Sequence, residues 1–134
     1  MRHLTSLVAG AFAVVLLCAV ASAQYGGWTI PPTAKEEKSP LKPGADVVKN
    51  GQAIFQANCQ RCHGPAGKGD GPDSDPKDPA ADLSDDFRTP LNPDGVLYYK
   101  VLNGHPPQMP AFDSKLSKNE IWSVVEYIKT LRKP

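Results

Sequence analysis

The sequence predicts a small all-α domain. Stretches at about residues 45–58, 96–103 and 118–131 carry apolar residues at spacings of three and four, which place side chains on one face of a helix. Prolines and glycines are concentrated between these stretches, where they favour turns and loops. A chain of 134 residues with no obvious internal repeat is long enough for one such domain.

The first predicted helix has a glycine in the middle of its apolar face. Gly51 lies at helical spacing from Val47, Val48, Ile54 and Phe55. A glycine inside a helix costs about 1 kcal/mol relative to alanine. Gly51 is therefore either a tolerated surface residue or a point where another helix crosses closely.

The second predicted helix is bounded by typical cap residues. Asn92 is predicted to be its N-cap with Pro93 in the first turn. Gly104 suits the C-terminal cap.

The last predicted helix begins with a capping box, formed by Ser117 and Glu120. One apolar stripe follows, and we expect it to face the core. It consists of Ile121, Val124, Val125, Ile128 and Leu131. Ser123, Glu126 and Lys129 are predicted to lie off this buried face.

The N-terminus has the pattern of a secretory signal peptide. A basic start and an apolar run precede a small-x-small site, which predicts cleavage after Ala23. The run is too short for a comfortable transmembrane helix, so we expect export to the periplasm and no stable membrane insertion after cleavage. The predicted organisation is a signal peptide at 1–23, a flexible or partly extended Pro-rich arm at 24–44, and the folded domain at 45–134.

The charge of the exported chain is balanced. Arg2 leaves with the signal peptide, so the remaining basic side chains equal the 14 acidic ones. This balance and the lack of a basic tract exclude a typical nucleic-acid-binding protein. An acidic run between Asp70 and Asp86 is most simply a solvated loop face, and alternatively a docking surface for a basic partner.

The residues with the clearest chemistry are Cys59-Gln60-Arg61-Cys62-His63. C-x-x-C-H is the attachment signature of c-type haem. Two thiols on one helical turn can both reach the edge of one porphyrin, and the next residue can turn a ring nitrogen toward the iron. The same cysteines also allow a thioredoxin-like redox motif, a disulfide, or a zinc site completed by His63 and His105. No strand–helix–strand pattern flanks the motif, and adjacent residues rarely point at one metal, so haem is preferred.

A lone methionine follows in a loop that three prolines keep from being helical, His105–Phe112. Met109 is the sole methionine besides Met1. By itself it could be a core filler.

These motifs together resemble the class I, mono-haem c-type cytochromes of the bacterial periplasm, over about residues 45–133. Gly51 and Phe55 resemble the glycine and aromatic of the family's first helix, and Cys59 follows Phe55 at the family's spacing. Tyr127 resembles the aromatic of the last helix that meets this glycine. Met-Pro-Ala-Phe from Met109 resembles the axial-ligand loop.

The resemblance implies a cytochrome c-like domain of about three to four helices wrapped around one covalently bound haem c. Cys59 and Cys62 would hold the haem, and His63 and Met109 would be the axial ligands of its iron. His105 is the competing ligand. A carbonyl in the loop after His63 would accept the proton of the other ring nitrogen. Pro72 and Pro79 are the candidates for this carbonyl.

Six-coordinate iron implies a one-electron carrier rather than an enzyme. Its partners would be a redox protein donor and acceptor, such as a dehydrogenase, reductase or oxidase. One alternative is a dedicated cytochrome subunit of a periplasmic dehydrogenase or reductase complex. Others are a ligand sensor or peroxidase, if Met109 leaves the iron, and a structural zinc protein.

Overall fold

The computed structural model describes residues 27–132. The predicted signal peptide, residues 1–23, lies outside this part. The chain divides into two compact units, residues 1–31 and 32–134, and the helices described below belong to the second. Between residues 27 and 132 the regular elements are all helices, so the predicted all-α class is confirmed. No helix in this part of the chain is long and apolar enough to cross a membrane.

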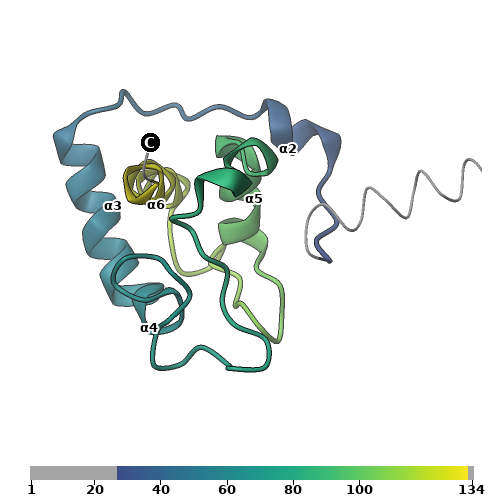
Figure 1. Cartoon of the computed structure of the whole chain (residues 1–134). Helices are drawn as coiled ribbons and strands as arrows, with labels where there is room; N and C mark the ends of the chain where they lie inside the picture. Colours follow the sequence, from purple (N-terminus) through teal and green to yellow (C-terminus); the bar gives the residue numbers. More distant parts are fainter. Residues whose placement is uncertain (1–26, 133–134) are drawn as a thin grey trace, which may run out of the picture. The chain divides into compact units, whose positions relative to one another are not determined.

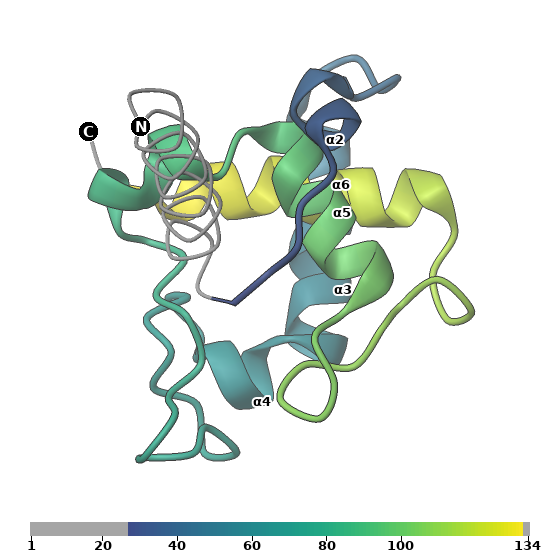
Figure 2. The same cartoon turned by 90° about the vertical axis from the view of Figure 1, so that its right-hand side faces the viewer.

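Three longer helices form the frame of the second unit: α3 (Ala45–Asn58), α5 (Asp94–Asn103) and α6 (Lys118–Leu131). Three short ones complete it: α2 (Pro32–Glu36), α4 (Gln60–His63) and the 3₁₀ helix η1 (Asp86–Leu91). Figure 1 looks along α6, with α3 on one side of it and α5 on the other, and Figure 2 shows the same helices after a quarter turn. The predicted bounds of the first helix agree with those of α3.

Helices α3 and α6 cross at Gly51. A methyl group on Gly51 would overlap the main-chain carbonyl oxygen of Ser123 and lie 3.0 Å from Cβ of Tyr127. The fully buried ring of Phe55 packs one turn further along, 5.2 Å from the Tyr127 ring between centroids. The close-crossing interpretation of Gly51 is thus confirmed, and so is its contact with Tyr127.

Helix α6 is buried on more than one face. Ser123 and Glu126, predicted to lie off the buried face, are 4% and 7% exposed, so that prediction is wrong. The reason is that α6 packs against α3 and α5 at once. The Ser123 hydroxyl is satisfied there, because it donates to the Asn119 carbonyl (3.0 Å) and accepts from Nδ2 of Asn50 (3.3 Å).

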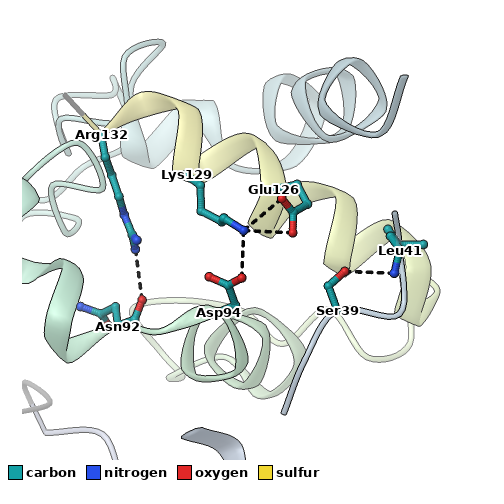
Figure 3. A network of polar contacts seen from close by, with 7 residues as sticks. All are labelled: Ser39, Leu41, Asn92, Asp94, Glu126, Lys129 and Arg132. Atoms are coloured by element: carbon teal, nitrogen blue, oxygen red, sulfur yellow. Dashed lines mark hydrogen bonds and ion pairs between the residues drawn. The ribbon is translucent and has the colours of Figure 1, made fainter. Parts of the chain in front are cut away.

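Helix α5 is held against α6 by a ring stack and by polar contacts. The rings of Tyr98 and Trp122 stack with centroids 4.3 Å apart. Nζ of Lys129 lies 2.9 Å from a carboxylate oxygen of Asp94 on α5 and 3.1 Å from Glu126 on its own helix (Figure 3). The ion pair with Lys129 explains how the buried Glu126 carboxylate is tolerated.

The start of α5 differs from the prediction. Pro93, not Asn92, is the N-cap, and no side chain caps the helix. The Asn92 side chain instead donates to the Arg88 carbonyl (3.0 Å) and accepts from Nζ of Lys100 (2.8 Å). The predicted end is confirmed, since Gly104 follows the last helical residue with φ of 62°.

The Pro-rich arm contains a helix that the sequence did not predict. Residues 32–36 form α2, which packs against α5 and buries Ala34 to 3% exposure. A helix of five residues is too short to show a periodic pattern. Residues 37–44 have no regular helix or strand.

We expect Gly51→Ala to lower the free energy of unfolding of the protein by about 1–3 kcal/mol. The overlap with a main-chain carbonyl cannot be relieved by a rotamer change, and it outweighs the higher helix propensity of alanine. Guanidinium chloride unfolding checks this. Gln52→Ala, on the exposed side of the same helix, is the control and should change stability by less than about 0.5 kcal/mol. Equal stability of Gly51→Ala and the parent would contradict the close crossing.

The capping box of α6 gives a pH-dependent prediction. Glu120 accepts hydrogen bonds from the Ser117 main chain (2.8 Å) and hydroxyl (2.7 Å), which confirms the box and lowers the pKa of Glu120 below its usual 4.5. Because the folded pKa is the lower one, this stabilisation is present above about pH 4.5 and is lost as the pH falls through the folded value.

Melting temperatures of the parent and Glu120→Ala should therefore differ at pH 7 and converge toward pH 3. Glu120→Gln serves as the comparison that keeps a hydrogen-bonding side chain without the charge. A difference between parent and Glu120→Ala that stays constant with pH would show that the carboxylate charge plays no part.

Candidate functional site

The Cys59–His63 motif lies on a turn directly after α3. Cys59 ends α3 by donating its N–H to the Phe55 carbonyl (2.8 Å). It also begins α4, because its own carbonyl accepts from the N–H groups of Cys62 (3.2 Å) and His63 (2.9 Å). The two thiols and the imidazole thus belong to one short helical segment, and the Gly51 crossing fixes the helix that leads into it.

The two cysteines are partly shielded from solvent. Both are half-buried and neither is in a disulfide. Burial raises the pKa of Cys59 to about 12, the neighbouring Cys62 adds to the rise, and Lys115 opposes it. Cys59 therefore keeps its proton at neutral pH.

The imidazole of His63 is oriented by a single hydrogen bond. Its Nδ1 lies 3.0 Å from the main-chain oxygen of Ala81. Burial lowers the pKa of His63, although the Ala81 bond opposes the shift, so the ring is neutral at pH 7. A carbonyl oxygen can only accept, so the one ring proton is on Nδ1. Nε2 then carries the lone pair that a metal ligand needs.

The carbonyl that accepts this proton was predicted at Pro72 or Pro79, and the structure places it at Ala81 instead. The segment around Pro72 packs behind the motif, where the Gly71 N–H donates to the Cys62 carbonyl (3.1 Å). Pro79 precedes the contact by two residues. No side-chain pattern could have identified the acceptor, because it is a main-chain carbonyl and every residue has one.

A glycine lets the segment with Ala81 approach His63. The Gly69 N–H donates to the His63 carbonyl (2.8 Å), and a side chain on Gly69 would overlap the carbonyl oxygen of Ala80. The φ of Gly69 is 76°, in the left-handed region that favours glycine. Ala80 is fixed in turn by the Ser74 hydroxyl, which accepts its N–H (3.0 Å).

An ion pair that the sequence did not reveal holds the motif on its exposed side. Nε and Nη2 of Arg61 donate to the two carboxylate oxygens of Asp73 at 2.5 and 3.0 Å, and the Asp73 N–H donates to the Arg61 carbonyl (2.8 Å). The pair raises the pKa of Arg61 and lowers that of Asp73. Both side chains are exposed, so the pair adds little stability and chiefly fixes the geometry of the loop.

Met109 lies in a loop that is tied to the end of α5. Its N–H and carbonyl pair with those of His105 at 3.1 and 2.7 Å. The buried Phe112 then donates its N–H to the carbonyls of Val101 (3.3 Å) and Leu102 (3.2 Å). The loop is therefore positioned by main-chain contacts to a helix that packs against α6.

Met109 and Cys59 pack against the same hydrophobic cluster, although 50 positions separate them in the sequence. The field of Lys115, which follows Met109 in the chain, also reaches the Cys59 thiol. The donor set on offer is two thiols, an imidazole with its Nε2 free to bind, and a thioether sulfur. This set fits a covalently attached haem with nitrogen and sulfur axial ligands. Their roles as ligands stay a prediction.

The zinc alternative needs a group of ligands. Between residues 27 and 132, no three His, Cys, Asp or Glu side chains are gathered closely enough to hold a metal ion.

Comparisons with known proteins agree with this site. Residues 46–128 match the family described as cytochrome c oxidase, cbb3-type, subunit III. The chain is 34% identical to cytochrome c6 of Alaria esculenta over 83 residues, which is 62% of this chain and 90% of that protein. It is 32% identical to cytochrome c6 of Bumilleriopsis filiformis over 81 residues, 60% of this chain and 87% of that protein.

Two solved structures have a similar fold. One is the Kuenenia stuttgartiensis reducing HAO-like protein complex Kustc0457/Kustc0458, with a TM-score of 0.59 and 28% identity over 71% of this chain. The match spans about half of that longer chain, 48% of its length. The other is the KustC0563 c-type cytochrome, with a TM-score of 0.52 over 62% of this chain and 98% of that one. Its identity of 21% supports the fold alone.

The family match covers more than half of the chain, and both cytochromes c6 are matched over most of their length. The chain therefore belongs to the mono-haem c-type cytochromes, electron-transfer proteins that carry covalently bound haem c.

Proposed function

We propose that this protein is a periplasmic one-electron carrier whose haem c is bound by Cys59 and Cys62 and ligated by His63 and Met109. The observation that carries the proposal is the orientation of His63. Its Nδ1 proton is held by the Ala81 carbonyl, so that Nε2 is left to bind a metal beside the two thiols. The predicted signal peptide at residues 1–23 supports export.

Each residue has a separate task. The thiols of Cys59 and Cys62 provide two covalent attachment points on one turn. The Ala81 carbonyl fixes the imidazole plane of His63 and raises its basicity. Met109 supplies a soft sulfur ligand, and methionine–histidine ligation raises the reduction potential. When bound, haem c supplies an iron that gains or loses one electron.

Ligation of the iron by both His63 and Met109 would favour electron transfer over the other candidate activities. With both residues bound, no position would remain for oxygen, peroxide or a substrate. A ligand sensor or a peroxidase would need Met109 to leave the iron. The tie between the Met109 loop and α5, through Phe112, restrains that movement.

We expect Met109→Ala to abolish the weak near-infrared sulfur-to-iron band of the oxidised protein and to allow carbon monoxide to bind the reduced form at pH 7. His105→Ala, which removes the competing ligand from the same loop, is the control and should keep the near-infrared band and exclude carbon monoxide. Absorption spectra of both haem-loaded variants give the answer. The reverse pattern would assign the sixth position to His105.

A second candidate function is a dedicated subunit of a redox complex. The observation that favours it is the 28% identity to a chain of a solved protein complex. In this case the segment before α3 would contribute to assembly. The partner would be a dehydrogenase or reductase rather than a pool of soluble acceptors.

The two candidates differ in the mass of the native protein. A free carrier, purified without a tag from the periplasm of its native organism, should elute from a size-exclusion column as a single chain. A subunit should elute with a second redox protein in fixed stoichiometry at 0.15 M salt. Elution as a single chain at micromolar concentration would reject the subunit function.

A further inference from the structure

The hydrogen bond that orients His63 joins two parts of the chain that are distant in the sequence. His63 ends α4, the short helix that directly follows α3. Its acceptor, the main-chain oxygen of Ala81, is 18 positions further along, in the loop between α4 and η1. The 3.0 Å distance between Nδ1 and this oxygen therefore depends on how the loop is held, and not on the motif alone.

Ala81 lies between two residues whose main chain is fixed. The Ala80 N–H donates to the Ser74 hydroxyl (3.0 Å). The Leu83 N–H donates to the Gly67 carbonyl (2.6 Å). Both bonds are internal to the loop, so they fix its shape but not its position against the helices.

A leucine at the end of α6 makes a contact that sets this position. Leu131 is the last residue of α6. A methyl group on Gly67 would lie 2.8 Å from Cδ1 of Leu131 and 3.3 Å from Cβ of Leu83. Gly67 is buried and its φ is 72°, in the left-handed region that favours glycine, so the two leucines lie directly over its main chain. Both leucines also pack against the hydrophobic core cluster.

The donor and the acceptor of the His63 bond are thus supported by different helices. The donor follows α3, and the acceptor belongs to a loop that packs on the end of α6, as can be followed in Figure 2. The two helices touch at Gly51. Movement of the loop away from Leu131 would lengthen the distance between Nδ1 of His63 and the Ala81 oxygen.

We propose that Leu131 is a positioning residue for His63. By packing on Gly67 and Leu83, it holds the Ala81 carbonyl within hydrogen-bonding distance of Nδ1. The inference rests on the proposed ligation of the haem iron by His63 and deepens it. Leu131 acts through the main chain of the loop and not as a ligand.

This packing has a consequence for the iron. A carbonyl that accepts the Nδ1 proton raises the basicity of a ligating imidazole. A more basic imidazole donates more charge and stabilises the oxidised iron. Loosening the loop weakens the hydrogen bond, so it raises the midpoint potential and exposes the Nδ1 proton to exchange with solvent.

The test measures both quantities in the haem-loaded full chain. Leu131→Ala removes the contacts with Gly67 and Leu83. In the reduced protein, the Nδ1 proton of His63 should exchange about tenfold faster than in the parent, measured by NMR, because the loop opens more easily. The midpoint potential should rise. Leu131→Met, which restores the reach of the side chain, should return both readouts most of the way to the parent values.

Leu41→Ala is the matched control. Leu41 is also a partly buried leucine on the core cluster, but it precedes the start of α3, whereas His63 follows its end. Its replacement should lower the overall stability and leave the Nδ1 proton exchange and the midpoint potential at the parent values.

Equal exchange rates and potentials in Leu131→Ala and Leu41→Ala would overturn the inference, because the effect would then follow overall stability. Faster exchange without a rise in potential would overturn it as well. If Leu131→Ala fails to fold, Leu131→Val decides, because valine lacks the Cδ atom that contacts Gly67.

Failure of the proposed function is detected separately, in the parent protein. If His63 does not ligate the haem iron, its ring protons in the reduced parent will lack the large ring-current shift that a haem ligand has. If the shift is present, the comparison between Leu131→Ala and Leu41→Ala tests the positioning role alone.

Discussion

The structure depends on the contact between α3 and α6 at Gly51. Because this position has no side chain, the Ser123 carbonyl of α6 can rest directly on α3. Phe55 and Tyr127 then fill the space beside the crossing. Helix α3 leads directly into Cys59, so the depth of the crossing sets where the C-x-x-C-H segment begins. A larger residue at 51 would displace a functional segment as well as a pair of helices.

Features that are encoded locally could be predicted from the sequence. The bounds of α3 and the capping box of α6 depend on residues within a few positions of each other. Gly51 could also be interpreted, because a mid-helix glycine is costly unless something needs the space. The burial of Ser123 and Glu126 could not be predicted, since helical periodicity assumes one buried face and α6 has neighbours on two sides.

Features that depend on the path of the chain could not be predicted. The partner of His63 is a main-chain oxygen 18 residues away, and any residue at position 81 would present one. The ion pair between Arg61 and Asp73 joins two exposed residues whose spacing in the sequence matches no known pattern of contact. Asn92 is a good N-cap residue by type, but contacts with Arg88 and Lys100 determine its role instead. In each case a tertiary contact outweighs the local preference.

The site also combines features that the local sequence encodes with features that tertiary contacts decide. The spacing of Cys59, Cys62 and His63 is a property of the sequence, and the turn that carries them follows from it. The position of Met109 cannot be inferred from the sequence in this way, because it depends on how Phe112 docks on the end of α5. A motif can therefore indicate the cofactor, whereas the environment that adjusts its chemistry has to be read from the structure.

The anchoring of α5 has a consequence for the speed of electron exchange. This helix is bound at its start, through Asp94 to Lys129 and through the Asn92 carbonyl to Arg132, and at its end, through Phe112 to the Met109 loop. A support fixed at both ends keeps the loop in nearly one position, and if Met109 ligates the iron as proposed, it would do so in both oxidation states. The nuclear rearrangement that accompanies each change of oxidation state is then small. A low reorganisation energy, rather than a large driving force, would allow such a protein to exchange electrons rapidly in both directions.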